Sequence, residues 1–193
     1  MQYNGSIEVN QRAGWRGAHY WRSCIADSWE LSNAGTMVLS AQQVADAPPG
    51  LIYSCKITAT TGQAVLGTNA TTGLSSTGLK VYLLRAASIR YGERTQPLTI
   101  GFWAKSSRTG VFTGCVRTAT TIRSYPWTYT IGNANTWEWK VVTVLPDTVT
   151  ALDTGMVPSL HVLFTPAVGA TRAGPPGAWS SNNPTYLPAR PVA

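Results

Sequence analysis

The side chains able to act as acids, bases or nucleophiles are few and scattered in this chain. The eight carboxylates are Glu8, Asp27, Glu30, Asp46, Glu93, Glu138, Asp147 and Asp153. Glycoside hydrolysis needs two carboxylates flanking one bond, and no spacing in the sequence pairs any two of them. Glu138 lies between Trp137 and Trp139 in an alternating segment, so we expect it on a solvated strand face.

Nucleophilic, metal-dependent and phosphate-binding chemistry has no better support. The chain has two histidines, His19 and His161, and no Gly-x-Ser-x-Gly nucleophile motif. His161 lies in a strand-like segment, where a hydrogen-bonded structural histidine is the better interpretation. No Walker loop, dinucleotide motif or His-x-x-x-His ligand pair is present. The sequence therefore predicts a protein that is not an enzyme, with no catalytic residues, no cofactor and no metal.

The three cysteines, Cys24, Cys55 and Cys115, form no Cys-x-x-Cys pair and have no metal-site spacing. An odd number of cysteines without a signal peptide is typical of a reducing compartment. We predict three free thiols that act as small buried apolar side chains.

Tryptophan is the aromatic residue that stands out. The eight are Trp15, Trp21, Trp29, Trp103, Trp127, Trp137, Trp139 and Trp179. Exposed indoles can stack on sugar rings or on a partner protein, whereas core packing is expected to account for more than half of them. Trp103 falls on the strand face opposite Phe102, and Trp127 shares a face with Tyr129. We therefore expect at least one of Trp103 and Trp127 to be exposed or to lie between subunits.

The elements that would position these side chains are β-strands, because apolar residues recur with period two along most of the chain. The predicted strands cover residues 37–44, 51–58, 79–84, 97–105, 111–117, 127–131, 137–144 and 159–165. The turn-like composition of residues 106–110 predicts that 97–105 and 111–117 form a central antiparallel hairpin. Helix signals are weak, with a turn or two at most over residues 82–90. The fold class is therefore all-β, a jelly-roll or β-sandwich.

Domain organisation follows from where this periodicity stops. Residues 1–165 are predicted to form one jelly-roll β-sandwich domain, within which residues 65–78 are an apolar-poor loop. Residues 166–193 are rich in Pro and Gly and read as an extended C-terminal segment. We expect this tail to drape over the sandwich or to reach a neighbouring subunit.

Charge and hydropathy exclude several classes of protein. The formal net charge is +7, and 12% of the residues are charged. The hydrophobic content of 44% is incompatible with wholesale disorder. The arginines are dispersed along the chain, whereas nucleic-acid proteins usually concentrate them on one element, so no nucleic-acid partner is predicted. No apolar run approaches the roughly 18 residues of a membrane-spanning helix, so no membrane is predicted either. The positive charge favours docking against an acidic protein surface.

A series of short segments resembles a module of tailed-bacteriophage structural proteins. It begins with Val9-Asn10-Gln11-Arg12 and Asp27-Ser28-Trp29, and continues with residues 99–107, residues 109–112 and Arg123-Ser124-Tyr125. It ends with Tyr129-Thr130-Ile131 and residues 133–138, so it spans residues 7 to about 150 in the expected order.

The chain departs from the module in three places. Ala13 stands where the family has Gly, and Ser28 replaces an Arg. The closing strand of the family, similar to Phe-Tyr-Ile-Thr-Gly-Val-Gln-Leu-Glu, is absent, and the Pro-rich tail takes its place. The last strand is therefore missing or supplied by a neighbour.

The resemblance implies a galactose-binding-like jelly roll on the virion surface, in fibres, spikes or head decorations, and no catalytic residues. We expect a non-enzymatic capsid decoration or cement protein that docks on other virion proteins, such as the major capsid protein, and is made in the cytoplasm of the bacterial host. The alternative is a tail or head fibre adhesin that binds a host-surface glycan. A homo-oligomer is expected, and the resemblance favours a trimer.

One segment has the composition of a partner-binding site. Arg123, Tyr125 and Trp127 combine a guanidinium with two aromatic rings beside the conformationally fixed Pro126. Arg, Tyr and Trp dominate the energetics of protein interfaces. A structured turn around a buried Trp127 explains the same residues equally well.

Overall fold

The structure is a computed structural model that describes residues 23–26, 29–32, 38–61, 78–83, 97–118, 123–149, 160–165 and 175–181. Every regular element in this part of the chain is a β-strand. The strands are β1 (Ser23–Ala26), β2 (Trp29–Ser32), β3 (Val38–Val44), β4 (Ser54–Thr61), β5 (Gly78–Leu83), β6 (Leu98–Ala104), β7 (Gly110–Thr118), β8 (Ser124–Ile131), β9 (Glu138–Val144) and β10 (Leu160–Thr165). The expected all-β character is confirmed for the described residues.

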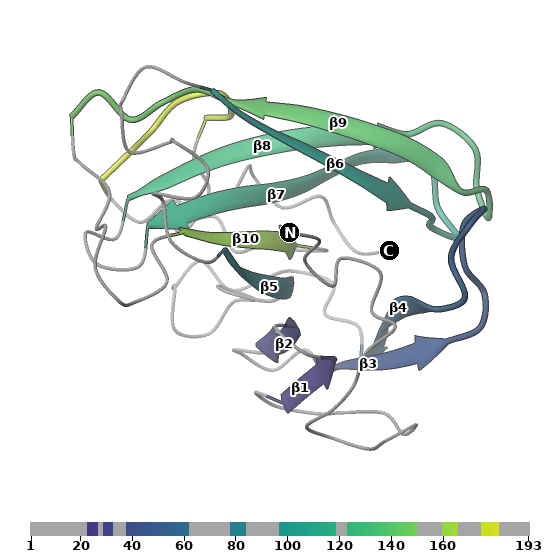
Figure 1. The fold of residues 1–193 in the computed structure, drawn as a ribbon. Helices are drawn as coiled ribbons and strands as arrows, with labels where there is room; N and C mark the ends of the chain where they lie inside the picture. The colour runs from purple at the N-terminus through teal and green to yellow at the C-terminus, as the bar shows by residue number, and fades with distance from the viewer. Residues whose placement is uncertain are drawn as a thin grey trace.

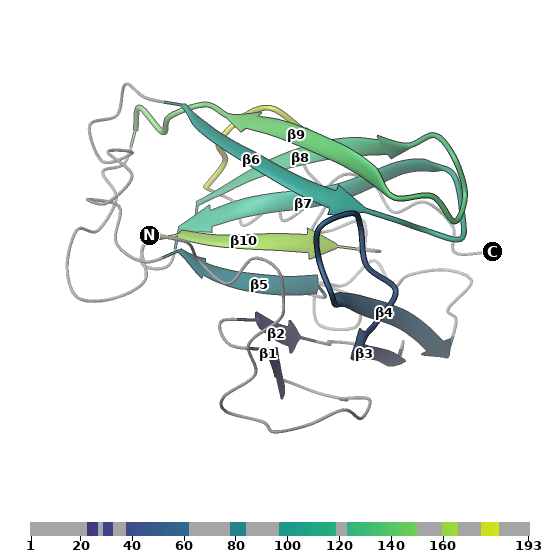
Figure 2. The same ribbon diagram turned by 45° about the vertical axis from the view of Figure 1, so that its right-hand side comes forward.

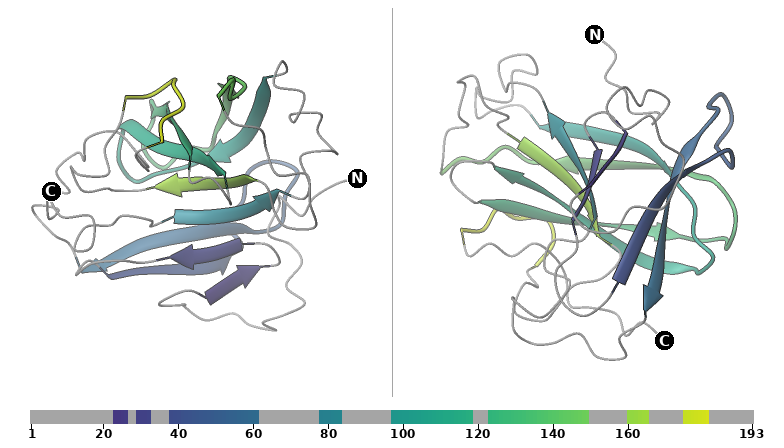
Figure 3. Two further views of the ribbon diagram at one scale, coloured as in Figure 1. Left: turned by 90° about the vertical axis from the view of Figure 1, so that its left-hand side faces the viewer. Right: turned by 90° about the horizontal axis from the view of Figure 1, so that it is seen from below.

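The strands pair antiparallel in three groups, none of which closes into a barrel (Figure 1). The largest sheet has six strands in the order β1-β2-β5-β10-β7-β8, and the side view in Figure 3 follows it from β1 at one edge. Strands β6 and β9 form one two-stranded sheet, and β3 and β4 form another. Neighbours in the six-stranded sheet are often distant in sequence, because β10 lies between β5 and β7.

The core lies between the β6–β9 pair and the β7, β8 and β10 strands of the large sheet. Alternation along β6 turns Leu98, Ile100 and Phe102 toward the buried cluster. The ring of Phe102 packs edge-on against Phe164 of β10, with centroids 4.8 Å apart, and tilts against Trp127 of β8 at 5.5 Å. Burying such aromatic rings between sheets is the main apolar contribution to stability in this region.

The predicted hairpin between residues 97–105 and 111–117 is wrong. Both segments are strands, but β6 pairs with β9 and β7 pairs with β8 and β10. Residues 105–109 cross from one sheet to the other, so the apolar face of β6 is covered by aromatic residues of β8 and β10. A hairpin would have placed both strands in one layer and left that face without its present cover.

The other strand predictions agree with the structure apart from their ends. The segments predicted at 37–44, 79–84 and 159–165 correspond to β3, β5 and β10, whereas the short strands β1 and β2 were not anticipated. The strand predicted at 51–58 starts later, at Ser54, and the preceding Leu51 and Ile52 are exposed in the β3–β4 loop. The expectations for residues 65–77, 84–90 and His19 lie outside the described residues, and His161 is half-buried on β10.

Two of the three cysteines can be compared with their predicted role. Cys115 is fully buried on β7, as predicted, and Cys55 is half-buried on β4; both are free thiols. Burial raises the pKa of each of these thiols to about 12. Cys24 lies on β1. In the part of the chain that the structure describes, no helix is long and apolar enough to cross a membrane.

Candidate functional site

The outward side of the β6–β9 pair carries an unusual group of exposed side chains, here called the aromatic face. Its members are Thr99, Gly101 and Trp103 on β6, and Trp139, Val141 and Thr143 on β9. They pair across the two strands as Thr99 with Thr143, Gly101 with Val141, and Trp103 with Trp139. Trp139 and Val141 are each more than half exposed, so apolar surface faces solvent on a short, regular sheet.

The exposed indoles of Trp139 and Trp103 lie against each other at a steep angle. A Cβ placed on Gly101 would come within 2.6 Å of Cζ2 of Trp139, so the six-membered ring of Trp139 occupies the space that a side chain at position 101 would take. Trp103 packs against Trp139 with ring centroids 5.5 Å apart and an interplanar angle of 65°. One side of the Trp139 indole therefore covers the strand while 53% of the residue stays exposed.

A polar cluster of Asp46, Lys105 and Trp137 adjoins this face and is called the carboxylate cluster below. Lys105 Nζ donates to both oxygens of Asp46, at 3.0 and 2.8 Å, and Trp137 Nε1 donates to Asp46 Oδ1 at 3.1 Å. The ammonium also lies 5.7 Å from the centre of the Trp137 ring, within the range of a cation–π contact. The hydrogen bonds of Lys105, and after it of Trp137, lower the pKa of the Asp46 carboxyl group.

Three connections that are distant in sequence meet at this cluster. Asp46 comes from the β3–β4 loop, Lys105 from the β6–β7 connection and Trp137 from the β8–β9 turn, and Figure 2 shows the β3–β4 loop beside the end of β6. The backbone N–H of Asn135 donates to the carbonyl of Ser106 at 2.7 Å, which joins the second and third connections. The cluster is therefore a product of the tertiary fold.

Local sequence makes the β3–β4 loop rigid. Leu51 N–H donates to the Pro48 carbonyl at 3.1 Å, and Gly50 has a φ of 85°, as a type II turn with Pro and Gly at its centre requires. The hydroxyl of Ser54 donates to the backbone carbonyl of Asp46 at 2.6 Å. Asp46 is thus held in place although its side chain is 58% exposed.

The expectation that Glu138 lies on a solvated face is wrong. Its carboxylate accepts hydrogen bonds from Lys140 Nζ at 2.5 Å and from the backbone N–H groups of Asn133 and Gly132 at 2.7 and 3.0 Å. It therefore closes the β8–β9 turn, and only 17% of its side chain is exposed. The hydrogen bond from Lys140, followed by those from the two N–H groups, lowers the pKa of Glu138 to about 2.

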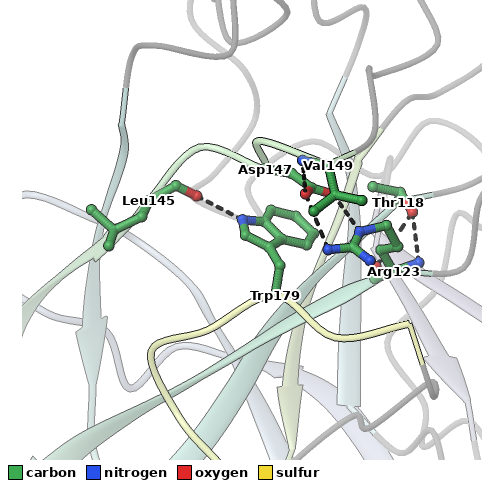
Figure 4. Close-up of polar contacts among 6 residues, drawn as sticks. All are labelled: Thr118, Arg123, Leu145, Asp147, Val149 and Trp179. Atoms are coloured by element: carbon green, nitrogen blue, oxygen red, sulfur yellow. Dashed lines mark hydrogen bonds and ion pairs between the residues drawn. The ribbon is translucent and has the colours of Figure 1, made fainter.

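The second region surrounds Arg123 and consists of Arg123, Asp147, Leu145, Thr118 and Trp179 (Figure 4). Arg123 donates from Nε and Nη2 to the two oxygens of Asp147, at 2.5 and 3.1 Å, and both residues are buried. Asp147 also accepts from the backbone N–H of Val149 at 3.0 Å. The bidentate pair fixes the segment that follows β9 against the start of β8.

Part of the C-terminal segment packs on β8 beside this pair. Ser124 and Ser180 exchange backbone hydrogen bonds of 3.1 and 3.0 Å, and Gly177 N–H donates to the Pro126 carbonyl at 2.9 Å. The indole of Trp179 donates to the Leu145 carbonyl at 2.7 Å, and its ring lies edge-on to Tyr125. Residues 175–181 therefore lie along the edge of the large sheet, and whether the rest of the tail drapes over this chain or reaches a neighbour stays a prediction.

The structure places the three predicted partner-binding residues on or just before β8 and buries all of them. Arg123 is 9% exposed, Tyr125 4% and Trp127 3%. Trp127 belongs to the core between the sheets, so the structural interpretation of this residue is the one that holds. An interface role for Arg123, Tyr125 and Trp127 stays a prediction, and their burial counts against direct contact with a partner.

Sequence analysis missed Trp139, Asp46 and Lys105 as possible site residues. For Trp139 the alternation of residues 137–144 was visible in the sequence, whereas its pairing with Trp103 came only from the structure. The pattern of β9 was interpreted the wrong way round: Trp139 faces solvent while Glu138 and Lys140 are half-buried. For Asp46 and Lys105, separated by 59 residues, the sequence holds no such signal.

Three carboxylates of the described residues form ion pairs with cations. Asp46 pairs with Lys105, Glu138 with Lys140 and Asp147 with Arg123. Within the described ranges, no three His, Cys, Asp or Glu side chains gather to hold a metal ion. The two regions are therefore an aromatic face with a polar cluster at its end, and an apolar segment held by a buried ion pair. Comparison of the chain with protein-family models, with curated proteins and with solved structures finds no match.

Proposed function

We propose that this chain is a non-enzymatic structural protein of a tailed-bacteriophage virion, built as a jelly-roll β-sandwich with an extended C-terminal segment. It decorates or cements the capsid surface by docking on other virion proteins, and it acts as a homo-oligomer, with a trimer favoured by the phage resemblance. The packing of the β6–β9 pair on the large sheet supports the sandwich, and the short phage-like segments support the virion assignment.

The single observation that carries the docking function is the exposed apolar segment after β9. Leu145 is 54% exposed and Val149 70%, and Pro175 and Pro176 are exposed on the C-terminal segment that packs beside them. Asp147 lies between Leu145 and Val149 and is fixed by the buried Arg123. A pre-positioned apolar surface loses little conformational entropy on binding.

In this proposal the predicted residues Arg123 and Tyr125 act indirectly. Arg123 holds the 145–149 segment through Asp147, and Tyr125 supports the ring of Trp179. The partner touches Leu145, Val149 and the prolines, while the net charge of +7 steers the chain toward an acidic capsid surface.

The test measures binding of the purified chain to virus particles that were produced without it. The double variant Leu145→Ser/Val149→Ser is expected to bind about tenfold or more weakly, as for central apolar contacts in other interfaces. Val111→Ser, which changes a valine on β7 that is as exposed as Leu145, should bind normally. Undiminished binding of the double variant would move the docking surface elsewhere, and a chain that binds no particle would refute the virion assignment.

The second candidate is a fibre adhesin that binds a host-surface glycan, and the exposed Trp103–Trp139 pair favours it. Copy number separates the two functions, since a decoration protein covers the whole capsid whereas fibres occupy few positions. Quantitative mass spectrometry of purified particles gives this number directly.

A further inference from the structure

We propose that the aromatic face and the adjoining carboxylate cluster together form a binding site for a neutral saccharide. The inference rests on the second candidate function and deepens it, because it assigns the residues that would bind the glycan and the class of sugar, on a surface separate from the 145–149 segment. Its support comes from the orientation of Trp139, from the hydrogen-bonding capacity left on Asp46 and Lys105, and from the inverted pattern of β9.

Trp139 provides a stacking surface. Its ring lies over Gly101, where a larger residue would displace it, and 53% of the residue is exposed. The C–H groups of a pyranose carry partial positive charge and suit the negative face of an indole. Trp103 is inclined at 65° to Trp139. It lies beside the Trp139 ring and gives a sugar ring a second apolar contact.

The carboxylate cluster supplies hydrogen-bonding partners for a sugar next to the aromatic face. Lys105 directly follows β6 and Trp137 directly precedes β9, so the cluster lies at the end of the two strands that carry Trp103 and Trp139. A carboxylate has about four acceptor positions and an ammonium three donors. The three hydrogen bonds to Asp46 leave one acceptor position on Oδ2, and Lys105 keeps a donor. Together they match a sugar hydroxyl, which donates and accepts at once.

Charge selects the class of ligand. Asp46 and Lys105 neutralise each other, as do Glu138 and Lys140. The charges of these two pairs therefore cancel, which suits a neutral sugar, while the ammonium of Lys56 on β4 is the further cation that acts on Asp46. The site is also preformed, since the Pro48–Leu51 turn and the bond from Ser54 fix Asp46 in the unbound chain.

The arrangement of β9 indicates that this exposure is maintained at a cost. Trp139 and Val141 face solvent, while Glu138 and Lys140 occupy the half-buried side and need each other and the turn amides as partners. The reverse orientation would bury Trp139 and Val141 and would expose Val142 and Val144, which now pack in the core. Places where a strand departs from its expected pattern are commonly functional sites.

The experiment is a titration of the full-length chain with linear oligomers of glucose, galactose, mannose and N-acetylglucosamine, four to six units long. Binding is followed by tryptophan fluorescence and by calorimetry. At least one oligomer is expected to bind, with Trp139→Ala and Asp46→Asn each weakening it by about tenfold or more. Trp139→Phe should lose less, because it keeps a ring face. Thermal unfolding of each variant establishes that it is folded.

The control is Val111→Ser, which alters an exposed valine away from the site and should bind the sugar normally. Absence of binding to every oligomer overturns the proposal, and so does sugar binding that Trp139→Ala and Asp46→Asn leave unchanged. Loss of particle attachment in Trp139→Ala, without sugar binding by the native chain, would show a protein-docking face and also overturn it. Failure of the Leu145 and Val149 test leaves this result unaffected, so the two proposals fail separately.

Discussion

Two tryptophans in this molecule cover a glycine on a neighbouring strand, yet they lie in opposite environments. Trp127 of β8 lies over its direct partner Gly114 of β7, on the side of the large sheet that faces β6. Trp139 of β9 lies over Gly101 of β6, on the outward side of the two-stranded sheet. Trp127 is 3% exposed and Trp139 53%. Each indole lies against a glycine, although Gly101 pairs with Val141 rather than with Trp139, and the layer behind each ring differs.

Tryptophan content alone therefore does not predict how much aromatic surface is exposed for binding. Trp127 is surrounded by the rings of Phe102, Tyr129 and Phe164, so its area stabilises the fold. Within the described residues the buried Trp127 Nε1 has no hydrogen-bond partner. Trp139 has Trp103 as its only ring contact among the described aromatic pairs, and its remaining area is available to a ligand.

Replacing each tryptophan by alanine is the strongest test of this comparison. Trp127→Ala is expected to lower the free energy of unfolding by about 3–5 kcal/mol, because it leaves a large cavity between the sheets. Trp139→Ala should change it by about 0.5 kcal/mol or less, as at other surface positions. Urea unfolding followed by circular dichroism measures both values. Equal losses would show that Trp139 is part of the core.

The buried Arg123–Asp147 pair should contribute more to the free energy of unfolding than the exposed Asp46–Lys105 pair. Asp147→Ala leaves the Arg123 guanidinium buried without a partner, and such losses cost about 3–5 kcal/mol. Asp46→Ala removes an exposed carboxylate whose interactions are screened by water, so its melting temperature should match that of the native chain. Scanning calorimetry of both variants provides the comparison. A double Arg123→Met/Asp147→Leu variant that regains stability would attribute the loss to the unpaired charge.

Gly114→Ala and Gly101→Ala sharpen the comparison at smaller cost. At Gly114 the new methyl group meets the buried Trp127 ring and, at 2.7 Å, the backbone oxygen of Leu163, so the expected loss is about 1–3 kcal/mol. At Gly101 the three nearest atoms all belong to the exposed Trp139 ring, which can swing into solvent with little loss of stability. A red shift of tryptophan emission in Gly101→Ala would report that movement, and a large destabilisation there would contradict it.

The smallest effect is expected at the β8–β9 turn, and it depends on pH. The pKa of Glu138 is about 2 in the folded chain and close to 4.5 when unfolded, so the unfolded state binds a proton first as pH falls. Its stabilising contribution is complete above about pH 4.5 and is lost progressively toward pH 2. Glu138→Gln should therefore flatten the decline of stability over this interval. Identical acid profiles for both chains would remove Glu138 as the cause.

The sequence by itself determined the class of the fold and the position of most strands. Alternation is a local property, because side chains of successive residues point to opposite sides of a strand. It located β3, β5, β6, β7 and β10, and it placed Phe102 opposite Trp103. The burial of Cys115 followed from the same reasoning. The four-residue strands β1 and β2 are too short to show a period, which is why they were missed.

Which strands pair, and which face of each strand is covered, depends on tertiary contacts and could not be predicted from local sequence. The five residues between β6 and β7 have turn composition, and this composition suits a crossing between sheets as well as a hairpin. The choice depends on burying the ring of Phe102 against β8 and β10, which no local pattern records. For the same reason Arg123 proved to be a buried partner of Asp147, and Asp46 was brought to Lys105 and Trp137. Contacts between distant residues depend on the free energy of the whole packed arrangement, whereas periodicity reflects only neighbours along the chain.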